Sequence, residues 1–286
     1  MSLCVAADRK LTHPTSKLPV KQASALETFA WDAASNPKDS TDRYGEHVQV
    51  QNSNRVTVWQ DQRFEYDQHG NLTYKIQGKR ASPAQVETRL FWDEAHQLSQ
   101  AVVTRGAGTS ATTQVYWYGY DALGRRVTKT DTFGTTTFAW DDNQMVLEQR
   151  GGKETQTIYQ PDSFVPLAQI HDGKLHHLHT DHLGTPLEAS NDAGQIVWKV
   201  TYKTWGNVVL EEFSEEVRQD TAPKLRFQGQ YFDAETGLHY NRFRYYDPGV
   251  GRFVNQDPIG LEGGINTRRH KGSVAAYQKH KGVKYR

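Results

Sequence analysis

Residues 64–72 of the chain read Phe-Glu-Tyr-Asp-Gln-His-Gly-Asn-Leu. Similar stretches are Leu-Phe-Trp-Asp-Glu-Ala-His-Gln-Leu at 90–98 and Tyr-Gly-Tyr-Asp-Ala-Leu-Gly-Arg-Arg at 118–126, and weaker copies begin at 29 and 138. In these copies an aromatic residue stands directly before an aspartate. Successive aspartates of the later copies are 26, 28 and 20 residues apart, at Asp67, Asp93, Asp121 and Asp141. Self-similarity at such spacing indicates a protein built from one small repeated unit.

Each copy predicts a strand, a turn and a second strand. The aromatic side chain ends the first strand, and the aspartate opens the turn by accepting a hydrogen bond from an amide two residues on. Gly70 and Gly124 tolerate the positive φ that such turns need. The stretches between the copies, such as 114–118, alternate in polarity as half-buried strands do.

One hairpin cannot bury its own face, so neighbouring hairpins must pair or stack. We therefore predict an all-β fold of repeated antiparallel β-hairpins, with residues 60–260 mostly in strands. Asp67, Asp121 and Asp141 are expected at hairpin turns, and the aromatic residues before them are expected to pack on one sheet face: Tyr66, Tyr120 and Trp140. A β-propeller or a β-sandwich would give the same local pattern.

The composition agrees with an all-β fold and argues against disulfide-linked and membrane-spanning proteins. Aromatic residues make up 11% of the 286-residue chain, and 23 glycines accompany them, which suits half-buried strands. Cys4 is the only cysteine, so no intrachain disulfide forms and synthesis in the cytoplasm is expected. No apolar run is long enough to span a bilayer, and residues 1–20 lack the apolar core of a signal peptide. Any export would then use a specialised system.

The second half of the chain carries further blocks. Residues 179–187 read His-Thr-Asp-His-Leu-Gly-Thr-Pro-Leu, and 227–238 read Phe-Gln-Gly-Gln-Tyr-Phe-Asp-Ala-Glu-Thr-Gly-Leu. They are followed by Tyr-Asn-Arg-Phe-Arg-Tyr-Tyr-Asp-Pro-Gly-Val-Gly-Arg-Phe at 240–253 and Asp-Pro-Ile-Gly-Leu at 257–261. With the aromatic-aspartate copies, these blocks resemble the YD repeats and the core of Rhs proteins, teneurins and the C subunits of insecticidal toxin complexes.

The resemblance implies a fold and an organisation. The family core is a β-strand spiral that closes into a hollow shell around a variable C-terminal toxin. We expect an N-terminal irregular segment at 1–28, a YD-repeat β region at 29–178, the Rhs domain and Rhs-associated core at 179–266, and a short basic divergent tail at 267–286.

The resemblance also implies a role and partners. The chain is expected to be a structural segment of the toxin-encapsulating shell, as an orphan or truncated core, in competition between bacteria. Its partners would be the C-terminal toxin or the rest of the shell, with type VI secretion as an export route. An alternative from the binding class is a surface module that contacts carbohydrate through exposed tryptophans and tyrosines.

Arg244, Asp247 and Asp257 are the candidate catalytic residues. Two carboxylates that share one proton can divide acid and base roles, although Asp-Pro is also good turn chemistry. The resemblance implies an aspartyl autoprotease that uses Asp257 and Arg244, with a second Asp-Pro-x-Gly about eighteen residues later. Lys279 stands in that region instead, and Asp247 is the substitute at hand. An enzyme here would be at most a self-cleaving protease with an incomplete aspartate dyad, and no cofactor is expected.

Five histidines lie within twelve residues, at His171, His176, His177, His179 and His182. A zinc site would need ligands that converge tetrahedrally. On a strand, His177 and His179 would face the same way, with Asp181 near them. The stretch is accounted for by the resemblance, so we expect structural hydrogen bonds and no metal.

The end of the chain is basic. Residues 262–286 hold seven of the 34 lysines and arginines, against one acidic residue, Glu262. Such a tail could contact nucleic acid through its cations and through Tyr277 and Tyr285. The alternative is a short end of unrelated sequence that is too small to fold alone, and we expect this, with no nucleic-acid partner.

Overall fold

The computed structural model describes residues 30–38, 48–218, 221–263 and 266–268. In these ranges the chain forms strands joined by short loops, three short 3-10 helices and no α-helix. The 3-10 helices are η1 (Asn52–Asn54), η2 (Gly108–Ser110) and η3 (Gly260–Gly263). The prediction of an all-β fold is confirmed. Residues 1–29, 39–47, 219–220, 264–265 and 269–286 lie outside the described ranges, and with them all of the predicted N-terminal segment and most of the predicted tail.

Sixteen strands form one sheet, called the outer sheet below. They are β3 (Val48–Gln51), β4 (Arg55–Trp59), β5 (Gln62–Tyr66), β6 (Leu72–Gln77), β7 (Val86–Trp92), β8 (Leu98–Arg105), β9 (Thr112–Tyr120), β10 (Arg126–Asp131), β11 (Gly134–Asp141), β12 (Gln144–Arg150), β13 (Lys153–Tyr159), β14 (Pro166–His171), β15 (Lys174–Thr180), β16 (Pro186–Ser190), β17 (Ile196–Tyr202) and β18 (Val208–Phe213).

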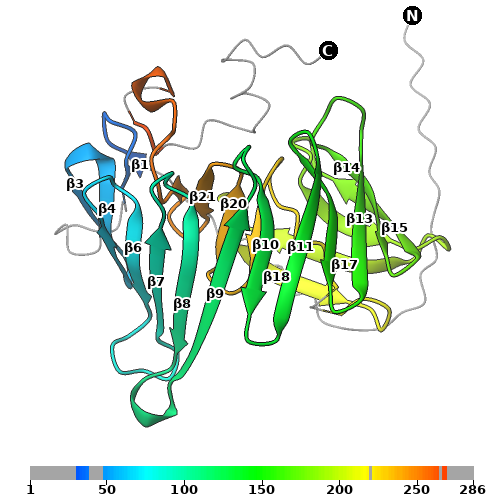
Figure 1. The fold of residues 1–286 in the computed structure, drawn as a ribbon, viewed down its shortest axis with the longest axis horizontal. Coiled ribbons are helices and arrows are strands. Elements are labelled where there is room, and N and C mark those ends of the chain that lie inside the picture. The colour runs from blue at the N-terminus through cyan, green and yellow to red at the C-terminus, as the bar shows by residue number, and fades with distance from the viewer. Residues whose placement is uncertain (1–29, 39–47, 219–220, 264–265, 269–286) are drawn as a thin grey trace, which may run out of the picture.

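Each strand from β4 to β17 pairs antiparallel with the strand before it and the strand after it in the sequence. The described edges of the sheet are therefore β3 and β18. Figure 1 shows the sheet curling round: the strands run across the view from β3 to β13, and β17 and β18 turn back behind them. Curling of this kind follows from the right-handed twist that accumulates between neighbouring strands.

A second sheet, called the inner sheet below, packs against the outer one. It contains β19 (Tyr231–Asp233), β20 (Leu238–Asn241), β21 (Arg244–Asp247) and β22 (Arg252–Phe253), again in sequence order. In Figure 1 its strands β20 and β21 lie behind β8 and β9. A small hairpin of β1 (Ala30–Trp31) and β2 (Pro37–Lys38) completes the described strands.

The main core lies between the outer and inner sheets. Leu72, Leu90 and Leu98 of the outer sheet and Leu238 and Tyr240 of the inner sheet are almost fully buried there. A smaller cluster forms where β15 to β17 meet the segment after β18. It contains Leu178, Ala189, Val197, Trp198, Val200, Val217 and Ala222.

The repeated turns have one common geometry. In the loop after β9, Asp121 Oδ1 accepts hydrogen bonds from the amides of Leu123 and Arg125, both at 2.9 Å, while Gly124 adopts a φ of +73°. The prediction that this aspartate opens the turn is confirmed. Four other loops repeat the pattern, with side chains that accept from the second and fourth following amides: Asp32, Asp93, Asp181 and Asn191.

Two predicted turns differ in detail. The Asp67 carboxylate reaches the amide of Asn71 at 2.8 Å, four residues on. Asp141 is the last residue of β11 and pairs with Gln144 across a two-residue turn, in which Asp142 adopts a φ of +46°. All the predicted aspartates therefore lie at hairpin turns.

The aromatic residues before the turns share one hydrogen-bonding pattern. Trp92, Tyr120 and Trp140 lie at or next to the ends of β7, β9 and β11, and each donates to the carbonyl oxygen of the first residue of the preceding strand, at 2.6, 3.0 and 2.8 Å. Tyr66 donates in the same way to Val56 at 2.9 Å. These rings are partly buried against the main core. The prediction that Tyr66, Tyr120 and Trp140 pack on one face is confirmed.

The predicted boundary between 178 and 179 falls within β15, where the outer sheet continues without a break. The change from one sheet to the other comes later, after β18. The predicted domain boundaries themselves stay predictions.

Candidate functional site

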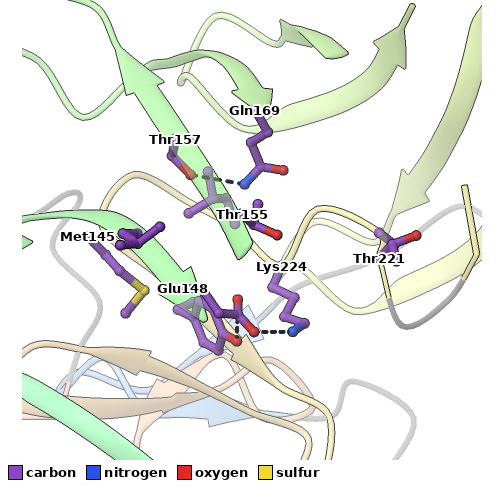
Figure 2. A pocket seen from close by; sticks show the side chains of 11 residues that line it. Met145, Glu148, Thr155, Thr157, Gln169, Thr221 and Lys224 are labelled. Atoms are coloured by element: carbon purple, nitrogen blue, oxygen red, sulfur yellow. Dashed lines mark hydrogen bonds and ion pairs between the residues drawn. The ribbon is translucent and has the colours of Figure 1, made fainter. Parts of the chain in front are cut away.

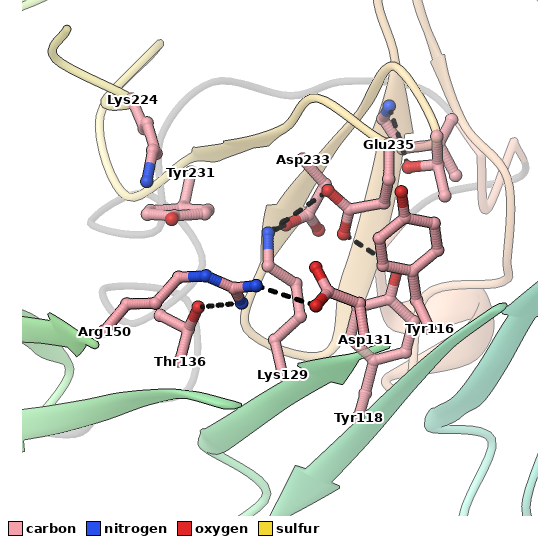
Figure 3. A network of polar contacts seen from close by, with 12 residues as sticks. Tyr116, Tyr118, Lys129, Asp131, Thr136, Arg150, Lys224, Tyr231, Asp233 and Glu235 are labelled. Carbon is pink, nitrogen blue, oxygen red and sulfur yellow. Dashed lines mark hydrogen bonds and ion pairs between the residues drawn. The ribbon is translucent and has the colours of Figure 1, made fainter. Parts of the chain in front are cut away.

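A buried ion pair joins the two sheets. Arg126, the first residue of β10, donates from both terminal nitrogens to Asp233 at the end of β19, at 2.6 and 3.0 Å. Neither side chain has any exposed surface. Lys129 extends the contact because its ammonium group lies 3.2 Å from Asp233 and 3.1 Å from Glu235. Figure 3 shows the Lys129 side chain pointing toward these two carboxylates.

Aromatic rings surround the Arg126 guanidinium. Its central carbon lies 4.3 Å from the ring centre of Tyr240 and 5.0 Å from that of Phe138. Tyr231 and Tyr118 follow at 5.2 and 5.5 Å. Guanidinium groups stack well on such faces because they are planar and weakly hydrated. The rings therefore replace water around a charge that the fold has removed from solvent.

The charges of this network hold each other in the ionised state. Burial by itself raises the pKa of the Asp233 carboxyl, but the charges of Arg126 and Lys129 outweigh burial and leave that pKa below its ordinary value. Burial also disfavours the charged guanidinium, but pairing with Asp233 raises the pKa of Arg126 well above its ordinary value. Because both groups stay charged, the pair holds the two sheets together and does not transfer protons.

Sequence reasoning missed this network although its residues lie in the quoted stretches. Arg126 occupies the repeat position of Leu72 and Leu98, the first residue of a strand, and all three are fully buried. An arginine at a repeat position that is otherwise buried and apolar indicates a buried ion pair, because buried charges need partners. Its partner lies 107 residues away in the sequence, which no local pattern reveals.

Two of the predicted catalytic residues lie together. Arg244 Nη1 lies 3.0 Å from Asp257 Oδ2, and both side chains are largely buried. The Arg244 guanidinium also lies over the ring of Phe253, at 3.6 Å from its centre. Asp257 Oδ1 accepts a hydrogen bond from the amide of Ile259 at 3.2 Å, as a residue that opens an Asp-Pro turn does.

Asp247, the third candidate catalytic residue, forms an ion pair with a different cation. Asp247 Oδ2 lies 2.6 Å from the ammonium group of Lys75, and its Oδ1 accepts from the amide of Gly249 at 2.8 Å. The candidate residues thus belong to two ion pairs, Arg244–Asp257 and Lys75–Asp247. An aspartic dyad needs two carboxylates that share a proton, whereas here each carboxylate is neutralised separately. Their catalytic role stays a prediction, and Lys279 lies outside the described residues.

The histidine-rich strand β15 has two different faces. His176 is buried, whereas His177 and His179 are exposed on the other face, as the alternation of a strand requires. His179 Nε2 lies 2.8 Å from the Ser190 hydroxyl on β16. Within the described ranges, no three histidine, cysteine, aspartate or glutamate side chains gather closely enough to hold a metal ion. The predicted absence of metal stays a prediction.

A small polar pocket lies beside the smaller cluster. Glu148 of β12 accepts from Lys224 at 2.5 Å and from the Tyr231 hydroxyl at 2.9 Å. Figure 2 shows Glu148 and Lys224 facing each other, with Thr155, Thr157 and Gln169 on the opposite wall. Burial raises the pKa of Tyr231 well above its ordinary value, so the hydroxyl remains a donor to Glu148. These contacts fasten the segment after β18 to the outer sheet.

Together these features define a class of protein: a curled antiparallel shell of aromatic-aspartate hairpins, closed on one face by an inner sheet. Comparison with known families agrees. The model of the Teneurin YD-shell family matches residues 12–281, a wider range than the stretches that carry the resemblance in the sequence. The chain belongs to the Teneurin YD-shell family.

Individual relatives are named as toxins. The chain is 37% identical over 270 residues to the double-stranded DNA deaminase toxin A of Burkholderia cenocepacia (strain H111), a match that covers 84% of this chain. It is 32% identical over 252 residues to the toxin protein Tse5 of Pseudomonas aeruginosa, which covers 74% of this chain. The chain spans 18% of the length of each of these relatives.

Solved structures share the fold. The crystal structure of TcdB2-TccC3 without its hypervariable C-terminal region aligns with a TM-score of 0.52 and 19% identity, over 85% of this chain and 15% of that one. The crystal structure of TcdB2-TccC3-Cdc42 aligns over the same shares of both chains, with a TM-score of 0.53 and 18% identity. At this identity the likeness concerns the fold alone.

The model contains no helix of the length and apolarity that a bilayer crossing requires, among the residues it describes.

Proposed function

We propose that this chain is a shell segment of an Rhs-type polymorphic toxin, and that its role is structural containment of the toxin. The observation that carries the proposal is the tie between Arg126 of the outer sheet and Asp233 of the inner sheet, deep in an otherwise aromatic core. A wall that encloses cargo must keep its curvature, and a second sheet fixed to its inner face supports this.

The chain covers only 18% of the length of the relatives named above, so we infer that its partners are the parts they carry in addition. The rest of the shell would meet the outer sheet at its described edges, β3 and β18, because an edge strand offers backbone groups to a further strand. The enclosed partner would be a toxin carried C-terminal to the core. Release into competitors through type VI secretion, after synthesis in the cytoplasm, belongs to the same proposal.

Neither alternative is favoured by the described contacts. Self-cleavage would need Asp247 and Asp257 to share a proton, and each has its own cation. Carbohydrate binding would need a set of exposed rings. Trp31 and Trp117 are exposed, but Tyr66, Trp92, Tyr120 and Trp140 are turned against the core.

A chimera tests containment. This chain would replace the segment of the Pseudomonas aeruginosa toxin protein Tse5 that it matches, and the C-terminal cargo would be followed by mass spectrometry during limited trypsin digestion. We expect the cargo to be digested at least about tenfold more slowly than the same cargo expressed alone. Cargo digested at the free rate, while the shell of the chimera stays intact, would contradict the proposal.

A further inference from the structure

Two buried arginines meet at the end of the inner sheet, and neither is hydrogen-bonded to a carboxylate. Arg252 and Arg268 are 5% and 1% exposed. The terminal nitrogens of Arg252 donate to the side-chain oxygens of Asn36 and Asn266, both at 2.6 Å. Those of Arg268 donate to the carbonyl oxygens of Val254, at 3.0 Å, and Gly70. All these acceptors are neutral, whereas Arg126 and Arg244 are each paired with an aspartate.

The two guanidinium groups share one cavity. Arg252 and Arg268 line it together with Tyr66, and the Asn266 side-chain oxygen accepts from both residues. The Nε of Arg268 is buried there and has no hydrogen-bond partner. The cavity also contains a carboxylate, Asp247, but Lys75 neutralises it at 2.6 Å. The lining therefore holds two guanidinium groups that are not hydrogen-bonded to a carboxylate, and Arg268 keeps one unused donor.

Burial outweighs the neighbouring carboxylates at both arginines. Burial lowers the pKa of Arg252 to about 10, an effect that Tyr66 and Asp32 oppose and to which the charge of Arg268 adds. Burial likewise lowers the pKa of Arg268, with Tyr66 and Asp67 opposing the effect and the charge of Arg55 adding to it. Buried charges in proteins are normally paired, because an isolated ion loses its hydration without a replacement. A bound anion would supply the missing counter-charge.

The size and the chemistry of the cavity restrict the ligand. The remaining space admits a single small guest, such as one water molecule or one halide ion, which excludes nucleotides and sugars. Guanidinium groups offer only donors, so the guest must accept hydrogen bonds. We propose that Arg252 and Arg268 form a binding site for a single small anion of the size of chloride. The anion fastens the segment around Arg268 to the inner sheet and, through Asn266 and Asn36, to the β1–β2 hairpin.

Bromide is the probe, because it replaces chloride and its anomalous scattering identifies it. Crystals of the full chain soaked in sodium bromide should show an anomalous peak within hydrogen-bonding distance of Arg268 Nε and the Arg252 guanidinium. A cavity that is empty or holds only water, in crystals that bind bromide elsewhere, would overturn the site. This measurement uses the unmodified chain and so does not depend on the folding of a variant.

An experiment in solution tests whether chloride stabilises the fold through Arg268. At constant ionic strength, replacing sodium gluconate by sodium chloride should raise the midpoint of thermal unfolding with a saturating dependence. Arg268→Met should lose this response, whereas Arg89→Met, at an exposed arginine of β7, should keep it. Equal midpoints in the two salts for the unmodified chain, or a full response in Arg268→Met, would contradict the proposal.

Discussion

Arg126 and Asp233 form a two-hydrogen-bond ion pair that is closed to solvent and joins residues 107 positions apart. Because each group is stable as an ion only beside the other, removing one leaves a buried charge. The pair thus determines which strand of the outer sheet the inner sheet lies against.

Breaking this pair should be costly. We expect Asp233→Asn to lower the free energy of unfolding by about 3–5 kcal/mol, measured by urea denaturation, because Arg126 then stays buried without its counter-charge. Glu188→Gln, which breaks an exposed pair with Lys199, should cost less than about 1 kcal/mol. The double variant Arg126→Leu with Asp233→Asn should recover part of the loss. Equal effects at the buried and exposed pairs would contradict this prediction.

His176 should make the fold sensitive to mild acid. Its burial lowers the pKa of the imidazole, an effect to which nearby Lys174 and His171 add and which Glu216 and Asp192 oppose. Unfolded His176 takes up a proton near pH 6.5, whereas the folded form does so only at lower pH, so the free energy of unfolding falls as pH drops below about 6.5.

The measurement is the urea midpoint between pH 7.5 and 5. We expect His176→Gln to reduce the slope of the midpoint against pH in this window. His182→Gln, at an exposed position, should leave the slope as it is. An unchanged slope in His176→Gln would show that other groups cause it.

Gly251 should resist substitution more than the turn glycine Gly173. It adopts a φ of +70°, and an added Cβ would lie 2.6 Å from the Trp205 ring. Gly173 has a similar φ of +81° but no atom within 4 Å of the added carbon. Gly173→Ala should cost about 1–2 kcal/mol from backbone strain alone, and Gly251→Ala about 1–3 kcal/mol more from the clash. Equal costs would mean that the Trp205 ring moves aside freely.

The purified chain should stay intact at 32.6 kDa. A self-cleaving dyad needs a second carboxylate beside Asp257, but Asp247 is paired with Lys75, and Lys279 stands near the expected sequence position of the other aspartate. Intact-mass measurement after prolonged incubation checks this. Loss of a peptide of about 25 residues, cut near Leu261 and abolished by Asp257→Asn, would instead show that Asp247 and Asp257 retain protease activity.

The histidine-rich stretch should hold no metal. We expect dialysed protein to contain less than about one tenth of an equivalent of zinc, because a stable site needs ligands that converge on one point. Stoichiometric zinc that survives dialysis and disappears when His179 and His182 are changed together would contradict this prediction.

The fold was predictable because its signals are local. The turn at Asp121 depends on residues within four positions, Leu123, Gly124 and Arg125, and Tyr120 reaches only the neighbouring strand. The same phrase has a different outcome at Trp31, which stands before Asp32 but is 55% exposed on the short β1–β2 hairpin.

The long-range part of the structure was not predictable from one sequence. The partner of Arg126 could be any buried acid, and the repeats do not identify Asp233. Arg268 is a second example, because it belongs to the stretch that we predicted as a divergent basic tail. It is almost fully buried and donates to Val254. Charge composition indicates solvent exposure on average, but it does not identify which cation of a basic stretch the fold encloses.

The order of the strands has a consequence for synthesis on the ribosome. Each strand of the outer sheet after β3 pairs with its predecessor, so the hairpins can form one after another as the chain emerges. The inner sheet begins only at residue 231, so Leu72, Leu90 and Leu98 are made more than a hundred residues before the strands that cover them. During that interval the nascent wall presents a large apolar surface, which makes it a natural client for a chaperone.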